Sequence, residues 1–261
     1  MTPDAGAAGR ATDADPLADD IRRTLTVPYR VRFDESTPAG TVRTSALLRY
    51  AQDCAWAHSE RLGFGRDWYR SRGLFWLVRA VELRLAGTLP TGATAAVTTT
   101  VVGFRHVLAR RRTTVAAPDG TPVASIDTDW AMVGDDGIPT RIPLEFPGVF
   151  GAPGERFATH RVPLPAVPDT AARSGLVVRP QALDPMAHAN NAVYLDWLDE
   201  ALAPMAPALL ERIPRRYRLE YLLPARPGIP VEVATWLTAP QAAACLLTDA
   251  DGELLRATVD A

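Results

Sequence analysis

The residues best suited to chemistry lie together in one short segment. Asp184 and His188 are four positions apart in the turn region, and Asn190 and Asn191, the only two Asn of the chain, follow after Ala189. A helical apolar pattern begins at Ala192, so we expect a carboxylate, an imidazole and the exposed N–H groups of a helix start to face one small volume. A carboxylate can act as a general base or a nucleophile, and helix N-terminal amides can stabilise an oxyanion. These groups suffice to hydrolyse an acyl ester or thioester.

The composition excludes several other chemistries. All 28 basic residues are Arg, which rules out a Schiff-base Lys, a pyridoxal-phosphate anchor and a Walker A loop. Cys54 and Cys245 form no CxxC pair, so neither a zinc ribbon nor a disulfide framework is indicated. A net charge of -2 gives no overall attraction to nucleic acid. We expect no metal, no cofactor and no nucleic-acid partner.

The sequence carries no sign of export or of a membrane span. Its first residues lack the basic and apolar regions of a signal peptide, and no stretch approaches the ~20 apolar residues that cross a bilayer. A cytoplasmic location is the resulting expectation.

A Pro-rich segment divides the chain into two similar halves. We expect a disordered N-terminal tail over 1–24, a first half over 25–145, a linker over 146–175 and a second half over 176–261. In each half an extended run and a turn precede a helical pattern, and Val- and Thr-rich strands follow. The shared order of elements indicates an internal repeat.

The two halves differ at the residues that could do chemistry. When the halves are aligned so that Pro38 matches Pro185, Thr37 and Thr41 fall where the second half has Asp184 and His188. We therefore expect one active site per chain, made by the second half, and a non-catalytic first half.

The predicted elements define an α+β fold. Each half has one helical pattern, from Thr44 or Ser45 to Gly63 in the first half and from Ala192 to Leu202 in the second. Strands are expected over 75–85, 93–102, 107–115 and 122–132, and then over 217–223, 230–237 and 242–248. The simplest fold is one long helix against an antiparallel sheet in each half, and joining the two sheets edge to edge would protect their edge strands.

The helix motif carries a family resemblance. The pattern D-x-x-x-H-x-N-N-x-x-Y, which starts at Asp184 and continues to an acid at Glu200, resembles the motif of hotdog-fold thioesterases. The wider sequence, over roughly residues 25 to 240, is similar to the double-hotdog acyl-[acyl carrier protein] thioesterases of plants and bacteria. The resemblance implies two tandem hotdog folds, each a long helix wrapped by an antiparallel sheet. It also implies Asp184 and His188 as catalytic residues and a fatty or related acyl thioester of acyl carrier protein, or of coenzyme A, as substrate.

Two positions depart from the plant-type pattern. Met186 stands where those enzymes have Asn, and Pro224-Ala225 stands where they have a Glu-Cys pair. Neither replacement supplies an acid, a thiol or a strong hydrogen bond. Two other interpretations therefore stay open: a hotdog hydratase or dehydratase, and an inactive acyl-binding double hotdog.

Further residues are candidates for supporting roles. Asn190 and Asn191 are expected to cap the helix or support an oxyanion, and Glu200 to act as an acid or to form a buried ion pair with Arg179 or Arg218. Four aromatic residues of the first half are candidates for an acyl pocket, with core packing as the alternative: Trp56, Trp68, Phe75 and Trp76. Three basic residues are candidates for docking an acidic carrier, with a solvated strand face as the alternative: Arg215, Arg216 and Arg218. The sequence leaves open whether two chains form a homodimer.

Overall fold

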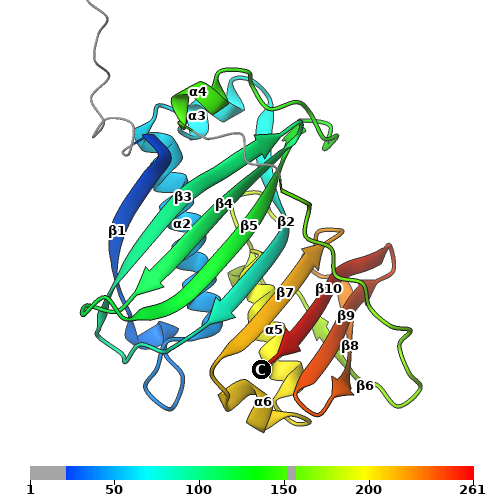
Figure 1. The fold of residues 1–261 in the computed structure, drawn as a ribbon. Coiled ribbons are helices and arrows are strands. Elements are labelled where there is room, and N and C mark those ends of the chain that lie inside the picture. The colour runs from blue at the N-terminus through cyan, green and yellow to red at the C-terminus, as the bar shows by residue number, and fades with distance from the viewer. Residues whose placement is uncertain (1–21, 152–156) are drawn as a thin grey trace, which may run out of the picture.

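The computed structural model describes residues 22–151 and 157–261. Within these ranges the strands form one antiparallel sheet of ten strands, and the helices pack on one of its faces (Figure 1). No helix in the described part of the chain has the length and apolarity needed to cross a bilayer. Most of the expected tail, residues 1–21, lies outside the described residues, and the first strand already begins at Thr24.

The secondary structure follows the predicted order in both halves. The first half contains β1 (Thr24–Arg30), η1 (Phe33–Glu35), α2 (Thr44–Arg61), α3 (Arg66–Arg70), β2 (Leu74–Leu85), β3 (Thr94–Arg105), β4 (Leu108–Ala116) and β5 (Pro122–Gly134). The second half contains β6 (Ala172–Val177), η2 (Pro180–Ala182), α5 (Val193–Leu202), α6 (Pro207–Glu211), β7 (Arg215–Tyr221), β8 (Pro230–Ala239), β9 (Ala242–Asp249) and β10 (Gly252–Asp260). A short helix, α4 (Phe146–Val149), lies between the halves.

The two halves share one strand order. From one edge to the centre the sheet runs β1-β3-β4-β5-β2, and from the other edge it runs β6-β8-β9-β10-β7, which is the same order with each strand replaced by its counterpart. At the centre β2 pairs with β7, with Leu83 opposite Tyr217. The predicted edge-to-edge joining is confirmed, and it leaves only β1 and β6 as edges of this sheet.

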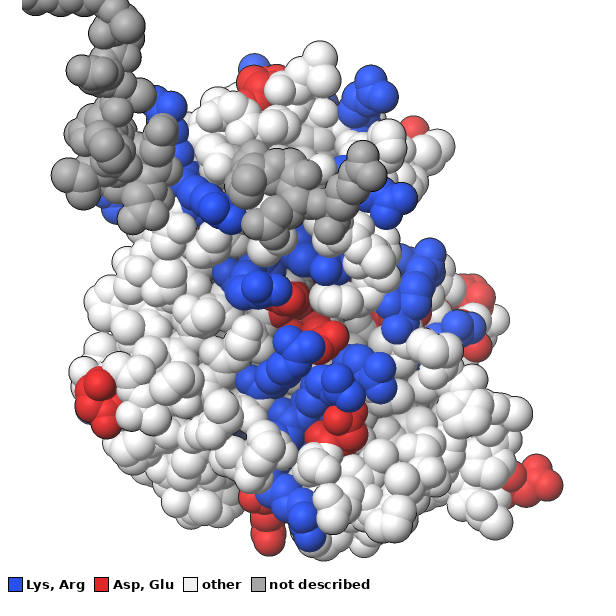
Figure 2. Space-filling view, in the orientation of Figure 1, with Lys and Arg blue, Asp and Glu red and all other residues white. Residues whose placement is uncertain are grey.

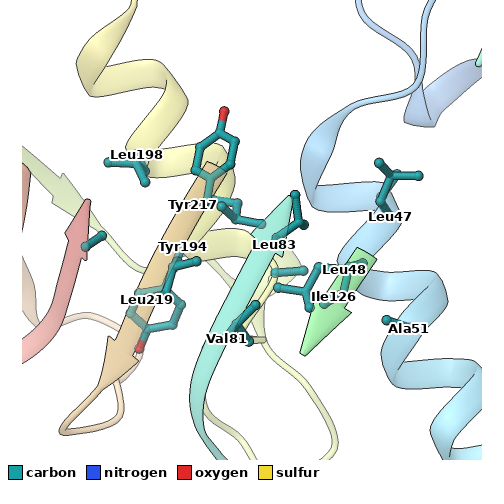
Figure 3. Packing of buried hydrophobic residues seen from close by; sticks show 14 of the residues in the cluster. Leu47, Leu48, Ala51, Val81, Leu83, Ile126, Tyr194, Leu198, Tyr217 and Leu219 are labelled. Atoms are coloured by element: carbon teal, nitrogen blue, oxygen red, sulfur yellow. The ribbon is translucent and has the colours of Figure 1, made fainter. Parts of the chain in front are cut away.

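One core lies between the sheet and the two long helices. The apolar faces of α2 and α5 point toward the sheet and contribute to one cluster of buried residues, as Figure 3 shows. The labelled residues come from both helices and from strands of both halves: Leu47, Leu48 and Ala51 from α2; Tyr194 and Leu198 from α5; Val81, Leu83 and Ile126 from the first half of the sheet; Tyr217 and Leu219 from β7. Because residues of both halves bury one another's surface, the halves are expected to fold as one unit.

The expected linker over 146–175 is shorter than predicted at its end. β6 starts at Ala172 and pairs with β8, where Ala172 lies opposite Thr235. Most side chains of β6 are exposed, so the strand has no apolar alternation that a sequence pattern could reveal. Backbone hydrogen bonds to β8 order the segment instead.

The face of the sheet opposite the helices is strongly charged. Figure 2 looks onto this face and shows Arg side chains gathered along its middle, intermixed with Asp and Glu. The pairs are formed across neighbouring strands, as with Arg110–Asp129 at 2.6 Å and Arg112–Asp127 at 2.7 Å. Ion pairs hold the middle of this face, and the main apolar core lies on the other side of the sheet.

Candidate active site

The segment from Leu183 to Ala189 forms one tight turn that holds both predicted catalytic residues. The Asp184 N–H donates to the His188 carbonyl at 2.9 Å, and the Ala187 N–H donates to the Asp184 carbonyl at 2.9 Å. Side-chain Oδ1 of Asp184 accepts the Met186 N–H at 2.8 Å. These bonds place Asp184 and His188 at the two ends of the same turn, and both residues are half-buried.

The first half contains an equivalent turn that has Thr37 and Thr41 in place of the acid and the imidazole. The Thr37 N–H donates to the Thr41 carbonyl at 2.7 Å, and the Gly40 N–H donates to the Thr37 carbonyl at 2.9 Å. Thr37 and Thr41 bond to each other through their hydroxyls at 3.0 Å. The backbone repeat is therefore close, while the acid and the imidazole occur in the second half only.

The Asn190 side chain holds the turn that leads into α5. Its Oδ1 accepts the Ala192 N–H at 3.0 Å, and its carbonyl accepts the Val193 N–H at 2.9 Å. Both of these N–H groups are therefore occupied. Among the described residues neither the Asn191 N–H nor the Tyr194 N–H has an acceptor, so both remain as backbone donors at this helix start.

The two positions that depart from the plant-type pattern both lie beside the turn. Met186 is exposed on the turn itself. Ala225 is fully buried, its carbonyl accepts the Ala189 N–H at 3.1 Å, and its N–H donates to the Tyr194 hydroxyl at 2.8 Å. The backbone at Ala225 thus supports the turn, but its side chain adds no acid or thiol to it.

Glu200 does not form the predicted buried ion pair. Its side chain is exposed, and Arg218 instead bonds to Thr258 at 3.1 Å and approaches Asp260. Glu200 lies on the outward side of α5.

α5 carries a half-buried acid, Asp199, which the sequence analysis missed. Its Oδ1 accepts the Tyr217 hydroxyl at 2.8 Å. Burial raises the pKa of Asp199 to about 6, against the lowering effects of the Tyr217 hydrogen bond and of nearby Arg215. A helical position next to another acid gave no sign of this burial.

Two of the four predicted acyl-pocket residues join an aromatic cluster. Trp68 packs edge-on to Phe64 with ring centres 4.8 Å apart, and the Trp76 indole N–H donates to the Tyr69 hydroxyl at 3.0 Å. Trp56 is 40% exposed, and its ring centre lies 6.5 Å from that of Tyr69. Phe75 neighbours Trp76 on β2, so its side chain points to the other face of the sheet.

Trp130 connects this aromatic cluster to the main core. It lies on β5 and packs against both groups of apolar residues. Its indole N–H is buried and lacks an acceptor among the described residues. Sequence reasoning did not assign Trp130 a role, because a Trp on a strand is usually core.

The three Arg residues predicted to dock a carrier do not lie on one face of the sheet. Arg215 is buried, and its guanidinium donates to the carbonyls of Leu210 and Arg212 beside α6. Arg216 and Arg218 lie on the opposite face of β7, where Arg216 pairs with Asp260 at 3.1 Å. The alternation of side chains along a strand separates Arg215 from Arg216, so the three cannot contact one partner together.

In the described part of the chain, no group of three or more His, Cys, Asp or Glu side chains is arranged to hold a metal ion. The fold and the turn thus define an α+β protein whose candidate site is an acid and an imidazole beside a capped helix start.

The comparisons with known proteins assign the chain to a family. The model of the acyl-ACP thioesterase N-terminal domain matches residues 23–146, and the model of the acyl-ACP thioesterase C-terminal domain matches residues 167–252. The chain therefore belongs to the acyl-ACP thioesterases, where ACP is acyl carrier protein, and it is a thioester hydrolase. No curated protein matches the sequence.

Solved structures of similar fold cover nearly the whole chain. A Lactobacillus plantarum protein described as an oleoyl thioesterase is 20% identical and aligns over 90% of this chain and 94% of its own, with a TM-score of 0.80. An acyl-ACP thioesterase from Bacteroides thetaiotaomicron is 14% identical and aligns over 93% of this chain and 98% of its own, with a TM-score of 0.79. The 12:0-ACP thioesterase from Umbellularia californica is 21% identical and aligns over 91% of this chain and 96% of its own, with a TM-score of 0.76. At these identities the likeness establishes the shared fold.

Proposed function

We propose that this chain hydrolyses a fatty or related acyl thioester of acyl carrier protein at the turn that holds Asp184 and His188. The observation that carries the proposal is the pairing of an acid and an imidazole on one hydrogen-bonded turn directly before a capped helix start. We further propose that each half is a hotdog fold, which the repeated strand order around α2 and α5 supports.

In the proposed reaction Asp184 has one of two roles. It acts either as a general base toward water or as a nucleophile toward the thioester carbonyl carbon. As a base it takes a proton from water while the water oxygen bonds to the carbonyl carbon; the C–S bond then breaks, and the thiol leaves with a proton. Its Oδ1 is fixed by the Met186 N–H, so the other carboxylate oxygen is held in a defined direction. His188, whose imidazole bonds to none of the described residues, assists the proton transfers.

The acyl chain is proposed to lie toward the aromatic cluster of the first half. Trp68 and Trp76 belong to that cluster, and Trp130 links it to the core that contains α5. Apolar walls of this kind suit a hydrocarbon chain, since burying it gains roughly 0.8 kcal/mol per CH₂.

A panel of acyl thioesters tests the proposal directly. The same acyl group is offered on acyl carrier protein and on coenzyme A, and released thiol is measured. We expect thiol release from both and a higher kcat/KM with the carrier protein. Equal kcat/KM values would favour a coenzyme A thioesterase.

Two further readouts in the same panel decide the remaining interpretations. Loss of enoyl absorbance without thiol release would show hydratase chemistry. Tight acyl binding with neither signal would show an inactive acyl-binding protein, and either result would contradict the proposed hydrolysis.

A further inference from the structure

The two long helices meet at equivalent positions. Arg49 of α2 bonds to Asp196 of α5 at 2.8 Å, and the two residues are 147 positions apart. The same offset relates the Thr37 turn to the Asp184 turn. When equivalent residues of two repeats contact each other, they lie beside the approximate twofold axis that relates the repeats. A residue one helical turn further along α2 is therefore expected to reach toward the second half.

Gln52 is that residue, and it contacts the candidate active site. Its Oε1 accepts a hydrogen bond from Nδ2 of Asn190 at 3.3 Å. The Asn190 side chain then has both ends engaged, because its Oδ1 caps Ala192. Gln52 thus fixes the orientation of the side chain that starts α5, from across the boundary between the halves.

The other end of the Gln52 amide is unused. Nε2 of Gln52 is buried and has no hydrogen-bond partner among the described residues. Leaving a buried N–H donor unpaired costs ~1–3 kcal/mol, so such a group calls for an explanation. A donor held next to a catalytic turn is suited to an oxygen that arrives with the substrate.

The position of α5 that is equivalent to Gln52 holds a hydrogen-bond acceptor and no donor. Asp199 occupies on α5 the place that Gln52 occupies on α2, and its carboxylate is already taken by the Tyr217 hydroxyl. The two equivalent positions therefore differ in charge: α5 has an acid there, and α2 has a neutral amide that contacts Asn190 beside the Asp184 turn. An acid in place of Gln52 would repel Asp184, and it would offer no donor.

We propose that Gln52 is the first half's contribution to the active site: Oε1 holds Asn190, and Nε2 donates a hydrogen bond to the carbonyl oxygen of the bound thioester. This rests on the proposed function, in which the thioester carbonyl is attacked at the Asp184 turn. It gives the non-catalytic half a specific part in the chemistry.

Two variants separate the holding role from the donor role. In Gln52→Glu the side chain keeps its shape and can still accept from Asn190, but it loses the donor and gains a charge. In Gln52→Met the donor and the acceptor are lost without any charge. Gln181→Glu is the matched control, because it makes the same chemical change at an exposed residue of η2, close to the turn in sequence.

Removing one oxyanion donor lowers kcat by ~10²–10³-fold, so we expect both Gln52 variants to lose kcat by roughly this factor while KM changes little. A binding measurement is paired with the kinetics. The probes are two acyl-pantetheine analogues, a ketone with CH₂ in place of sulfur and a thioether with CH₂ in place of the carbonyl. The wild type should prefer the ketone, and both variants should lose that preference.

Three results would overturn the proposal. The first is a kcat for either variant within about threefold of the Gln181→Glu control. The second is a loss in Gln52→Glu alone, which would show charge repulsion. The third is a lower melting temperature with an unchanged preference for the ketone, which would show a structural role only. If the wild type releases no thiol, the proposed function fails instead.

Discussion

Asp184 has one carboxylate oxygen committed to the turn and one available for chemistry. Its Oδ1 accepts the Met186 N–H, which is the bond of an ordinary turn-forming Asp. The structural and the catalytic interpretation of this residue are therefore compatible, because the two oxygens can serve different purposes. His188 has no comparable commitment within the described residues.

Asp199 should make the free energy of unfolding depend on pH. Its pKa of about 6 in the folded state exceeds the ordinary value of ~3.9, so in the window between about pH 4 and 6 the unfolded chain loses the proton first. Stability therefore falls as pH rises through this window and stays lower above it. Asp199→Asn should abolish the fall and raise the free energy of unfolding at pH 8 by up to about 3 kcal/mol.

Urea denaturation at pH 4 and pH 8 measures this effect. Glu200→Gln is the control, since Glu200 is the neighbouring acid on α5 and is exposed. An equal change in Asp199→Asn at both pH values would mean that Asp199 does not hold its proton in the folded state.

Sequence reasoning found the residues of the turn but missed those of the facing helices. Asp184, His188 and Asn190 lie within seven consecutive residues, so their spacing alone brings them together. Gln52 and Asp199 are polar residues within amphipathic helices, where such residues usually face solvent. Contacts with residues distant in the sequence cover them, Asn190 at Gln52 and Tyr217 at Asp199, and such contacts have no local sequence signal.

At the scale of elements, the turn before α5 contains a strained residue. Ala187 has φ 61°, while its counterpart Gly40 has φ 75°. A residue other than Gly is destabilised by roughly 1–2 kcal/mol at such a positive φ. Replacing Ala187 by Gly would remove this strain, but the more flexible unfolded chain would offset part of the stabilisation. Ala187→Gly should therefore raise the free energy of unfolding by up to about 1 kcal/mol.

Gly40→Ala is the reciprocal variant, and it should lower the free energy of unfolding by about 1 kcal/mol. A Cβ at Gly40 would meet nothing within 4 Å, so any loss reports backbone strain alone. Chemical denaturation checks both changes. Two variants that shift stability in the same direction would show that the two turns are not equivalent.

The sequence predicted most elements within a few residues because their patterns are strong. The helical pattern from Thr44 matches α2, and that from Ala192 matches α5, which starts at Val193. The short helices α3, α4 and α6 were missed, since a single turn has little periodicity. β6 was missed at its start because its exposed residues do not alternate.

At the scale of the whole molecule, the sheet separates two faces with different properties. The helices, the core and the Asp184 turn lie on one face, and the Arg-rich surface of Figure 2 lies on the other. The sequence predicted that the two sheets join, but the β2–β7 register depends on packing between the halves and could not be predicted.

This separation changes the expectation for carrier docking. Arg216 and Arg218 project from the face opposite α5, and both approach Asp260. We expect the double variant Arg216→Ala, Arg218→Ala to leave KM for carrier-bound substrate within about twofold of wild type, because exposed charges far from a contact are screened by salt. A larger rise in KM for the carrier-bound substrate, with KM for a small thioester unchanged, would show that the carrier does dock on this face.

The whole-molecule asymmetry leads to the central claim, which is that chemistry occurs at Asp184 in the second half and not at the equivalent turn of the first. Asp184→Asn keeps the size of the side chain and its bond to the Met186 N–H, so the fold should survive. The double variant Thr37→Ala, Thr41→Ala is the control at the equivalent turn, and its kcat should stay close to wild type.

The most direct measurement is kcat for thiol release by the wild type, Asp184→Asn and the Thr37→Ala, Thr41→Ala control on one acyl-carrier substrate. Loss of a general base lowers kcat by ~10²–10⁴-fold, equivalent to roughly 3–5 kcal/mol of barrier, with little change in KM. We predict a fall of this size in Asp184→Asn only. A folded Asp184→Asn enzyme that keeps more than about a tenth of the wild-type kcat would contradict the assignment.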